Sequence, residues 1–153
     1  MHTTFAFLVK QPHLSTREFI TYYETKHIPM INRLAGPENQ PLVYKRRYTH
    51  RDDPAFVFVT ASVDASGAPV STTTGSHGDD GATPDGSKVE EHPGNIDFDV
   101  MTEIGFADKE GKARWLAALN KGENAQLVRE DEARFLWRER TRAVVVEEFV
   151  SFG

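Results

Sequence analysis

The chain has no cysteine among its 153 residues. This absence excludes disulfide bonds, thiolate catalysis and metal or iron–sulfur sites held by cysteine. The first residues lack a basic segment followed by an apolar one, so we expect no secretory signal. No apolar run approaches the ~20 residues that cross a bilayer. We therefore expect a cytoplasmic protein that has no membrane partner.

Several motifs of well-known enzyme classes are also missing. No dinucleotide-binding Gly-x-Gly-x-x-Gly occurs, and residues 105–112 fail as a phosphate loop because their glycines lie one residue too far apart. No Gly-x-Ser-x-Gly nucleophile motif is present. The six histidines show no metal-ligand spacing, so we expect no metal and no other cofactor. The net charge of -5 makes nucleic acid an unfavourable partner.

What the sequence does contain begins with a well-marked helix. Ser15 and Glu18 fit a capping box, and Leu14 and Phe19 fit the hydrophobic staple that accompanies it. Five residues then recur at helical spacing on one stripe: Phe19, Tyr23, His27, Ile31 and Leu34. A Gly-Pro pair after the stripe predicts the end of the helix.

Runs of branched and aromatic residues predict the strands. They cover residues 5–10, 42–51, 98–106 and 143–150, with a further β-like run at 56–63. Two more helical stretches are predicted at 108–120 and 123–140, the second of them re-capped at Asp131. Residues 64–97 are rich in glycine, serine, threonine, proline and aspartate, which predicts a flexible insertion. This insertion is either a disordered loop or a lid that orders over a ligand.

Without the insertion, the order of elements is βαββαβ. This pattern predicts a single α+β domain over 1–153, ferredoxin-like, with its helices on one face of an antiparallel sheet. The first strand is apolar on both faces, since Phe5 and Phe7 alternate with Ala6 and Leu8. The helices cover one face only, so we expect a homodimer in which a second copy of the sheet covers the other.

Residues 22–30 (YYETKHIPM) are chemically unusual. Pro29 cannot donate a hydrogen bond to the carbonyl of Thr25, which predicts a kink beside His27 on the buried stripe. A histidine at such an irregularity can face a cavity between helix and sheet. The segment resembles the signature of EthD-domain proteins, which is an aromatic pair, an acidic residue and then His-x-Pro. Residues 98–104 and 131–135 resemble the third strand and the Asp-Glu-x-x-Phe segment of that family.

This resemblance implies a dimeric α/β barrel. Similar barrels include cofactor-free monooxygenases, muconolactone isomerases, polyketide cyclases and dehydratases, and some haem enzymes. The long insertion resembles that of fungal members in secondary metabolism. The expected function is a cofactor-independent lyase, dehydratase or cyclase acting on a small polyketide-like substrate. The alternatives are a cofactor-free oxidoreductase, a monooxygenase or oxidase acting on an aromatic polyketide, and a non-enzymatic ligand-binding accessory protein.

The candidate catalytic residues are His27 as the base, assisted by Glu103, Asp99 or Tyr23. The structural alternative for His27 is a core histidine bonded to a backbone carbonyl near the kink. Asp99 and Glu103 share one strand face, where each needs a partner. They either pair with lysine or arginine, or one of them acts as a general base or orients the His27 ring.

Six further residues are candidates for binding a flat aromatic ligand: Tyr22, Tyr44, Tyr48, His50, Trp115 and Phe135. Tyr44, Tyr48 and His50 share one face of the predicted second strand. Packing in the core or the dimer interface is the structural alternative for Tyr22 and Trp115. A place on the surface is the alternative for His50.

Overall fold

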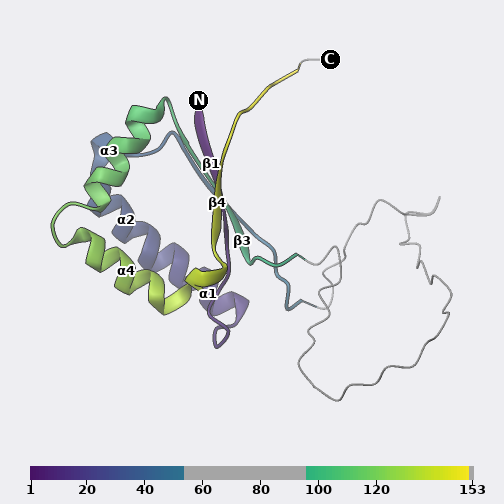
Figure 1. The fold of residues 1–153 in the computed structure, drawn as a ribbon. Helices are drawn as coiled ribbons and strands as arrows, with labels where there is room; N and C mark the ends of the chain where they lie inside the picture. Colours follow the sequence, from purple (N-terminus) through teal and green to yellow (C-terminus); the bar gives the residue numbers. More distant parts are fainter. Residues whose placement is uncertain (54–95, 152–153) are drawn as a thin grey trace, which may run out of the picture.

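The structure, a computed structural model, describes residues 1–53 and 96–151. Within these residues, four antiparallel strands form one sheet in the order β2-β3-β1-β4. The strands are β1 (His2–Leu8), β2 (Val43–Tyr48), β3 (Val100–Phe106) and β4 (Arg142–Val146). All the helices lie on one side of this sheet (Figure 1). The predicted ferredoxin-like α+β fold is therefore confirmed.

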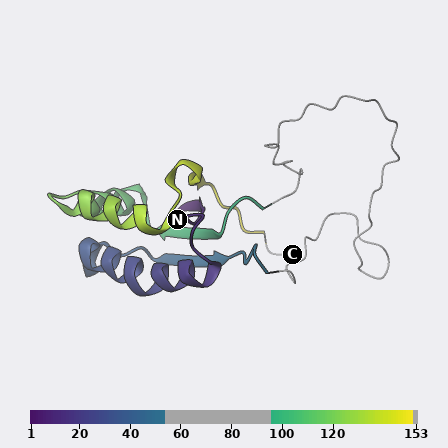
Figure 2. The same cartoon turned by 90° about the horizontal axis from the view of Figure 1, so that it is seen from below.

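The helical layer has two parts that lie side by side under the sheet (Figure 2). The first part is a continuous rod of α1 (Thr16–Tyr22), a π-helical turn η1 (Tyr23–His27) and α2 (Ile28–Ala35), followed by the short η2 (Pro37–Asn39). The second part consists of α3 (Lys109–Leu119), α4 (Asn124–Phe135) and the short η3 (Arg138–Arg140).

The first helix begins as its sequence predicts. The Ser15 hydroxyl accepts the backbone N–H of Glu18, and the Glu18 carboxylate accepts the backbone N–H of Ser15. Phe19 is fully buried in the core, and Leu14 packs against the same cluster. The capping box is confirmed, and it fixes where the stripe that carries His27 starts.

The irregularity predicted at Pro29 is a widened turn in the helix. The Ile28 N–H donates to the carbonyl of Tyr23, five residues earlier, because the helix passes through the π-helical turn η1. Pro29 then occupies the first turn of α2, where its missing N–H is tolerated. π-helical turns are frequent at functional sites. The widened turn places His27 at the junction of η1 and α2.

Strand alternation decides which residues face the helices. Ala6, Leu8 and Thr102 lie on the helix side, whereas Phe5 and Phe7 lie on the opposite face. The core beneath the helix side has two clusters. One contains Leu8, Phe19, Tyr23, Ile28, Val100, Phe135 and Leu136, and the other contains Ile31, Ala35, Phe106, Trp115 and Leu119.

Some predicted boundaries are wrong. β1 covers residues 2–8 and not 5–10, and the predicted helix 123–140 ends at Phe135 because the chain becomes extended at Leu136. The Trp137 N–H then donates to the carbonyl of Val9 at 2.8 Å. Asp131 lies inside the continuous helix α4 and caps nothing. The predicted run 56–63, and the predicted insertion apart from residues 96 and 97, lie outside the described residues.

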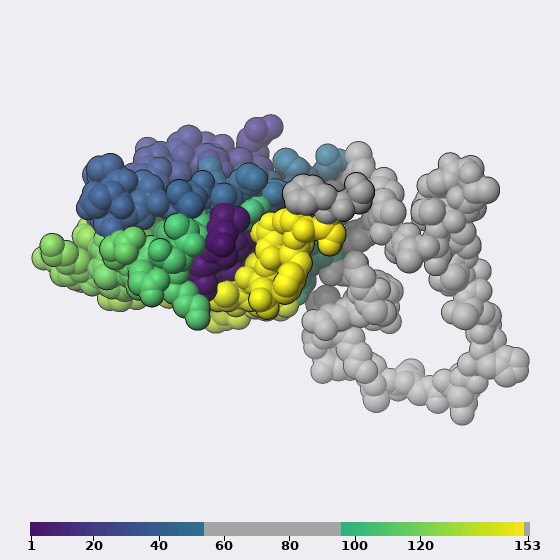
Figure 3. Space-filling model, turned by 90° about the horizontal axis from the view of Figure 1, so that it is seen from above, coloured from purple at the N-terminus to yellow at the C-terminus, as the bar shows by residue number. Residues whose placement is uncertain are grey.

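None of the described helices covers the other face of the sheet, and this uncovered face is apolar around β1 and β4. Phe5 lies opposite Val144 in the sheet register, and Val144 is 48% exposed. The C-terminal segment runs next to the N-terminal strand on the surface (Figure 3). Phe149, beyond β4, is 83% exposed. None of the described helices is long and apolar enough to span a membrane.

Candidate functional site

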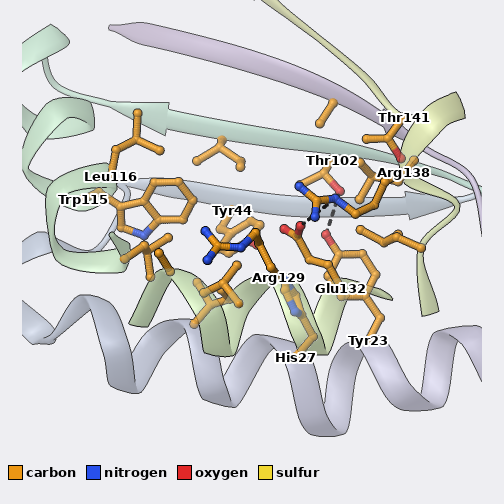
Figure 4. A pocket seen from close by; sticks show the side chains of 18 of the residues that line it. Tyr23, His27, Tyr44, Thr102, Trp115, Leu116, Arg129, Glu132, Arg138 and Thr141 are labelled. Atoms are coloured by element: carbon orange, nitrogen blue, oxygen red, sulfur yellow. Dashed lines mark hydrogen bonds and ion pairs between the residues drawn. The ribbon is translucent and has the colours of Figure 1, made fainter. Parts of the chain in front are cut away.

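A cavity of about 520 Å³ lies between the helices and the sheet (Figure 4). Its volume falls within the ~300–1,000 Å³ that is usual for small-molecule sites. Much of its wall is apolar, with Leu8 and Ile104 from the sheet and Leu119 and Val128 from the helices. A small set of polar side chains interrupts this wall, which is the composition that typically binds and orients an organic ligand.

His27 forms part of the cavity wall and is held in place by α4. Its Nδ1 lies 2.7 Å from Oδ2 of Asp131, and the Tyr22 hydroxyl donates to Oδ1 of the same carboxylate at 2.7 Å. His27 and Asp131 are both buried. Since an ionised carboxylate can only accept, Nδ1 carries the proton toward Asp131. Nε2 of the neutral ring is then left with a lone pair that can accept a proton.

Aromatic rings fix the plane of the imidazole. The Tyr23 ring centroid lies 5.3 Å from that of His27, and the Phe135 centroid lies 4.9 Å away. Phe135 is fully buried and packs on Tyr22 as well. The imidazole is therefore held by a hydrogen bond at Nδ1 and by rings packed around it, which preorganises it for proton transfer.

Two tyrosines and a threonine form a hydroxyl cluster in the cavity. The Tyr23 hydroxyl lies 3.2 Å from Oγ1 of Thr102, and the Tyr44 side chain lines the same cavity beside it. Burial raises the pKa of Tyr23, and it raises the pKa of Tyr44 well above the ordinary value. Both hydroxyls therefore keep their protons at neutral pH. They are hydrogen-bond donors suited to a carbonyl or enolate oxygen of a ligand.

A charged network lies behind the hydroxyl cluster. Arg46 donates to both carboxylate oxygens of Glu24, at 2.7 and 3.0 Å, and its guanidinium stacks over the Tyr44 ring at 5.0 Å. Tyr48 donates to the same Glu24 carboxylate. Neither Arg46 nor Tyr48 lines the cavity. This network fixes the position of Tyr44 and ties η1 to β2.

Helix α4 supplies the remaining charged groups of the cavity. Arg129 and Glu132 lie one turn apart and both line it. Glu132 pairs with Arg138 of η3 across 3.5 Å. Burial raises the pKa of the Glu132 carboxyl, whereas the neighbouring Arg138 and His27 oppose that rise. Glu132 is therefore a partly desolvated carboxyl near His27, an environment often found for acid–base groups.

The ten candidate site residues divide into three groups. Four line the cavity: Tyr23, His27, Tyr44 and Trp115. Two lie behind His27: Tyr22, through its bond to Asp131, and Phe135, through ring packing. The other four lie elsewhere: Tyr48, His50, Asp99 and Glu103. His50 is exposed and follows the end of β2 with a left-handed φ of 29°, so it does not share the Tyr44 face.

The expectation that Glu103 or Asp99 orients His27 is wrong, because Asp131 holds the ring. Glu103 lies on the sheet face away from the helices and binds Arg47 at 3.0 Å. Asp99 precedes β3 and is 2% exposed. Its carboxylate accepts two hydrogen bonds from Arg51 and one from the backbone N–H of Lys10. This geometry is the structural pairing with arginine that the sequence left open for both residues.

Asp131 was not predicted as the partner of His27, and Glu132, Arg129 and Arg138 were not predicted as residues of the cavity. A signal for some of them exists in the α4 sequence. The positions of α4 that line the cavity follow the spacing i, i+3, i+4 and i+7: Ala125, Val128, Arg129 and Glu132. Two charged residues share this stripe with apolar ones, and a few polar groups in a largely apolar wall are typical of ligand sites.

Among the residues that the structure describes, no group of three His, Asp or Glu side chains is placed to hold a metal ion.

The comparisons with known proteins point to one family. No curated protein matches the sequence of this chain. The family model of the EthD domain matches residues 11–139. This match covers most of the chain, including His27, the cavity-lining residues of α4 and the sheet residues of the hydroxyl cluster, and the protein therefore belongs to the EthD-domain family.

Proposed function

We propose that this protein is a cofactor-independent acid–base enzyme, a dehydratase or other lyase, or a cyclase, acting on a polyketide-like small molecule. One observation carries the proposal: Asp131 holds Nδ1 of His27 at 2.7 Å while the His27 ring lines a largely apolar cavity. An oriented neutral imidazole in such a cavity is equipped to remove a proton from carbon. Membership of the EthD family fits a small-molecule function.

In this mechanism, Nε2 of His27 removes a proton from the carbon next to a carbonyl of the substrate. Asp131 stabilises the imidazolium that forms, since its carboxylate already accepts the Nδ1 proton. The neutral hydroxyls of Tyr23 and Tyr44 donate to the enolate oxygen as its charge develops. These donors need no rearrangement, because Thr102 and the Arg46 network hold them in place.

Glu132 completes the reaction as the acid. In a dehydration, its proton goes to the β-hydroxyl, which leaves as water while the enolate electrons form the carbon–carbon double bond. In a cyclisation, the enolate carbon attacks a second carbonyl and Glu132 protonates the alkoxide that results. Burial raises the pKa of Glu132, which makes the protonated form that this step requires easier to reach than in an exposed glutamate.

A small model substrate tests the elimination. 3-Hydroxy-1-tetralone loses water to give naphthalen-1(4H)-one, which tautomerises to fluorescent 1-naphthol. We expect the protein to accelerate this loss, and His27→Gln to reduce kcat by ~10²–10⁴-fold, the usual contribution of a general base. The matched control is His50→Gln, since His50 is exposed and outside the cavity. Both variants should keep the circular dichroism spectrum and melting temperature of the wild type.

Other outcomes separate the competing functions. A folded His27→Gln variant with full activity would remove His27 from the mechanism. Oxygen uptake that matches turnover would favour the oxidoreductase. Tight binding with no turnover of this ketone, or of open-chain polyketone substrates, would favour a ligand-binding accessory protein.

A further inference from the structure

One of the charged side chains that line the cavity has no direct partner. His27 is paired with Asp131, and Glu132 is paired with Arg138. Arg129 also lines the cavity, yet it has no ion pair or hydrogen bond to any residue in the described ranges 1–53 and 96–151. The cavity therefore carries one cation that has no direct partner in the part of the chain that the structure describes.

The position of Arg129 gives this cation access to a ligand. Its guanidinium extends from α4 across the cavity, toward the space between Trp115 and Tyr44 (Figure 4). Glu132 lies one helical turn further along the same helix and points toward Arg138 (Figure 4). Arg129 therefore faces an aromatic part of the wall, whereas the carboxylate of the neighbouring Glu132 is engaged by Arg138.

The neighbouring groups favour an anion here. The carboxylate of Asp131 is buried, and both of its oxygens are hydrogen-bonded, one to His27 and the other to Tyr22. Glu132 pairs with Arg138, and its burial raises the pKa of the carboxyl, which disfavours the charged form. The hydroxyls of Tyr23 and Tyr44 remain neutral donors. The two carboxyl groups are therefore each bound by other side chains, which leaves Arg129 as the charged group available to an anionic ligand.

We propose that the cavity takes a planar aromatic or polyketide acid and that Arg129 binds its carboxylate. The planar guanidinium matches the two oxygens of a carboxylate and can also stack on a flat ring. With its carboxylate at Arg129, the ligand would extend along the apolar wall so that its ketone lies beside His27. This inference rests on the proposed function and adds the class of substrate: a keto acid whose acidic group is bound apart from the reacting carbon.

Binding of two matched probes tests the charge requirement. 2-Naphthoate and 2-naphthamide have nearly the same shape, but only the first is an anion. By calorimetry at low ionic strength, we expect the wild type to prefer naphthoate by on the order of ten-fold or more, as charge-assisted hydrogen bonds provide. Added salt should reduce this preference, because Arg129 is exposed to solvent.

Variants assign the preference to Arg129. Arg129→Gln should lose it, and Arg129→Lys should recover part of it, since lysine keeps the charge but not the planar fork. Arg114→Gln is the matched control, an exposed arginine on α3 outside the cavity. Equal affinity for the acid and the amide, an undiminished preference in Arg129→Gln, or no binding of either probe would overturn the inference.

The same experiments separate the two proposals. If His27→Gln loses turnover but naphthoate has no advantage over its amide, the inference about Arg129 fails and the acid–base function stands. If the preference depends on Arg129 but His27→Gln turns over normally, the acid site stands and the proposed function fails.

Discussion

Oδ2 of Asp131 lies 2.7 Å from Nδ1 of His27, although 104 residues separate them in the sequence. The contact joins α4 to the end of η1, the two parts of the helical layer. It fixes the tautomer of the imidazole, and the Tyr22 hydroxyl fixes the carboxylate in turn. Two hydrogen bonds therefore determine which nitrogen of His27 can act as a base.

Asp131→Asn should disable His27 without unfolding the protein. The amide has nearly the same shape but no charge, and it can donate to Nδ1 and so stabilise the wrong tautomer. We expect kcat to fall by up to ~10⁴-fold, the effect of the equivalent change in a catalytic triad. Nitrogen-15 NMR of the imidazole should show the proton on Nδ1 in the wild type and its loss from Nδ1 in the variant. Tyr22→Phe, which leaves the carboxylate in place, should have a smaller effect. An unchanged tautomer with full activity in Asp131→Asn would contradict this role.

Glu132→Gln should change how stability depends on pH. Burial raises the pKa of Glu132 in the folded protein above the ordinary value of 4.5. The protonated carboxyl is thus favoured by folding, and this contribution is lost as the pH rises through the raised pKa. Glutamine stays neutral throughout. The melting temperature of the variant, relative to that of the wild type, should therefore increase as the pH rises from about 4 toward neutrality.

The control for this prediction is Glu130→Gln, an exposed residue on the same helix. Its melting temperature should follow that of the wild type over the same pH range. A constant difference between Glu132→Gln and the wild type at every pH would show that the Glu132 carboxyl titrates as it does in the unfolded chain.

Asp99→Asn should reduce stability and leave catalysis intact. Asp99 is 2% exposed and its carboxylate accepts two hydrogen bonds from Arg51. An amide is uncharged and has only one acceptor oxygen, so it cannot accept both hydrogen bonds from this guanidinium. We therefore expect a loss of about 1–3 kcal/mol in the free energy of unfolding. Denaturant titration measures that loss. Asp97→Asn is the control, because the Asp97–Arg142 pair is exposed and should contribute little. A large fall in turnover per folded molecule would restore Asp99 as a catalytic candidate.

Val144→Lys tests the homodimer that we propose through the uncovered face of the sheet. Val144 lies opposite Phe5 on that face and is 48% exposed. In a dimer its burial would remove apolar surface from water, so a lysine there should favour the monomer. Leu127→Lys, at a site on α4 that is 44% exposed, should leave the dimer intact. Sedimentation velocity at micromolar concentration distinguishes the two species. A wild-type protein that sediments as a monomer would refute the proposal.

Local physical chemistry in the sequence was enough to predict most of the fold. The capping box at Ser15 and the stripe through His27 depend on contacts between residues three or four apart, so they are visible in the chain itself. Strand alternation likewise showed that Tyr44 and Tyr48 share a face. The βαββαβ order follows from such local patterns, because each element is specified within a few turns or pleats.

The partners of His27 were decided by tertiary structure. Alternation placed Asp99 and Glu103 on one face of a strand, but a strand that is apolar on both faces does not show which face the helices cover. The helices cover the face of Thr102, so Glu103 meets Arg47 and α4 brings Asp131 to His27. The sequence by itself determined that a histidine lies on a buried stripe beside Pro29. Only the packing of α4 against η1 determined which carboxylate orients it. The two segments are far apart in the sequence, and local periodicity carries no information about contacts between such distant segments.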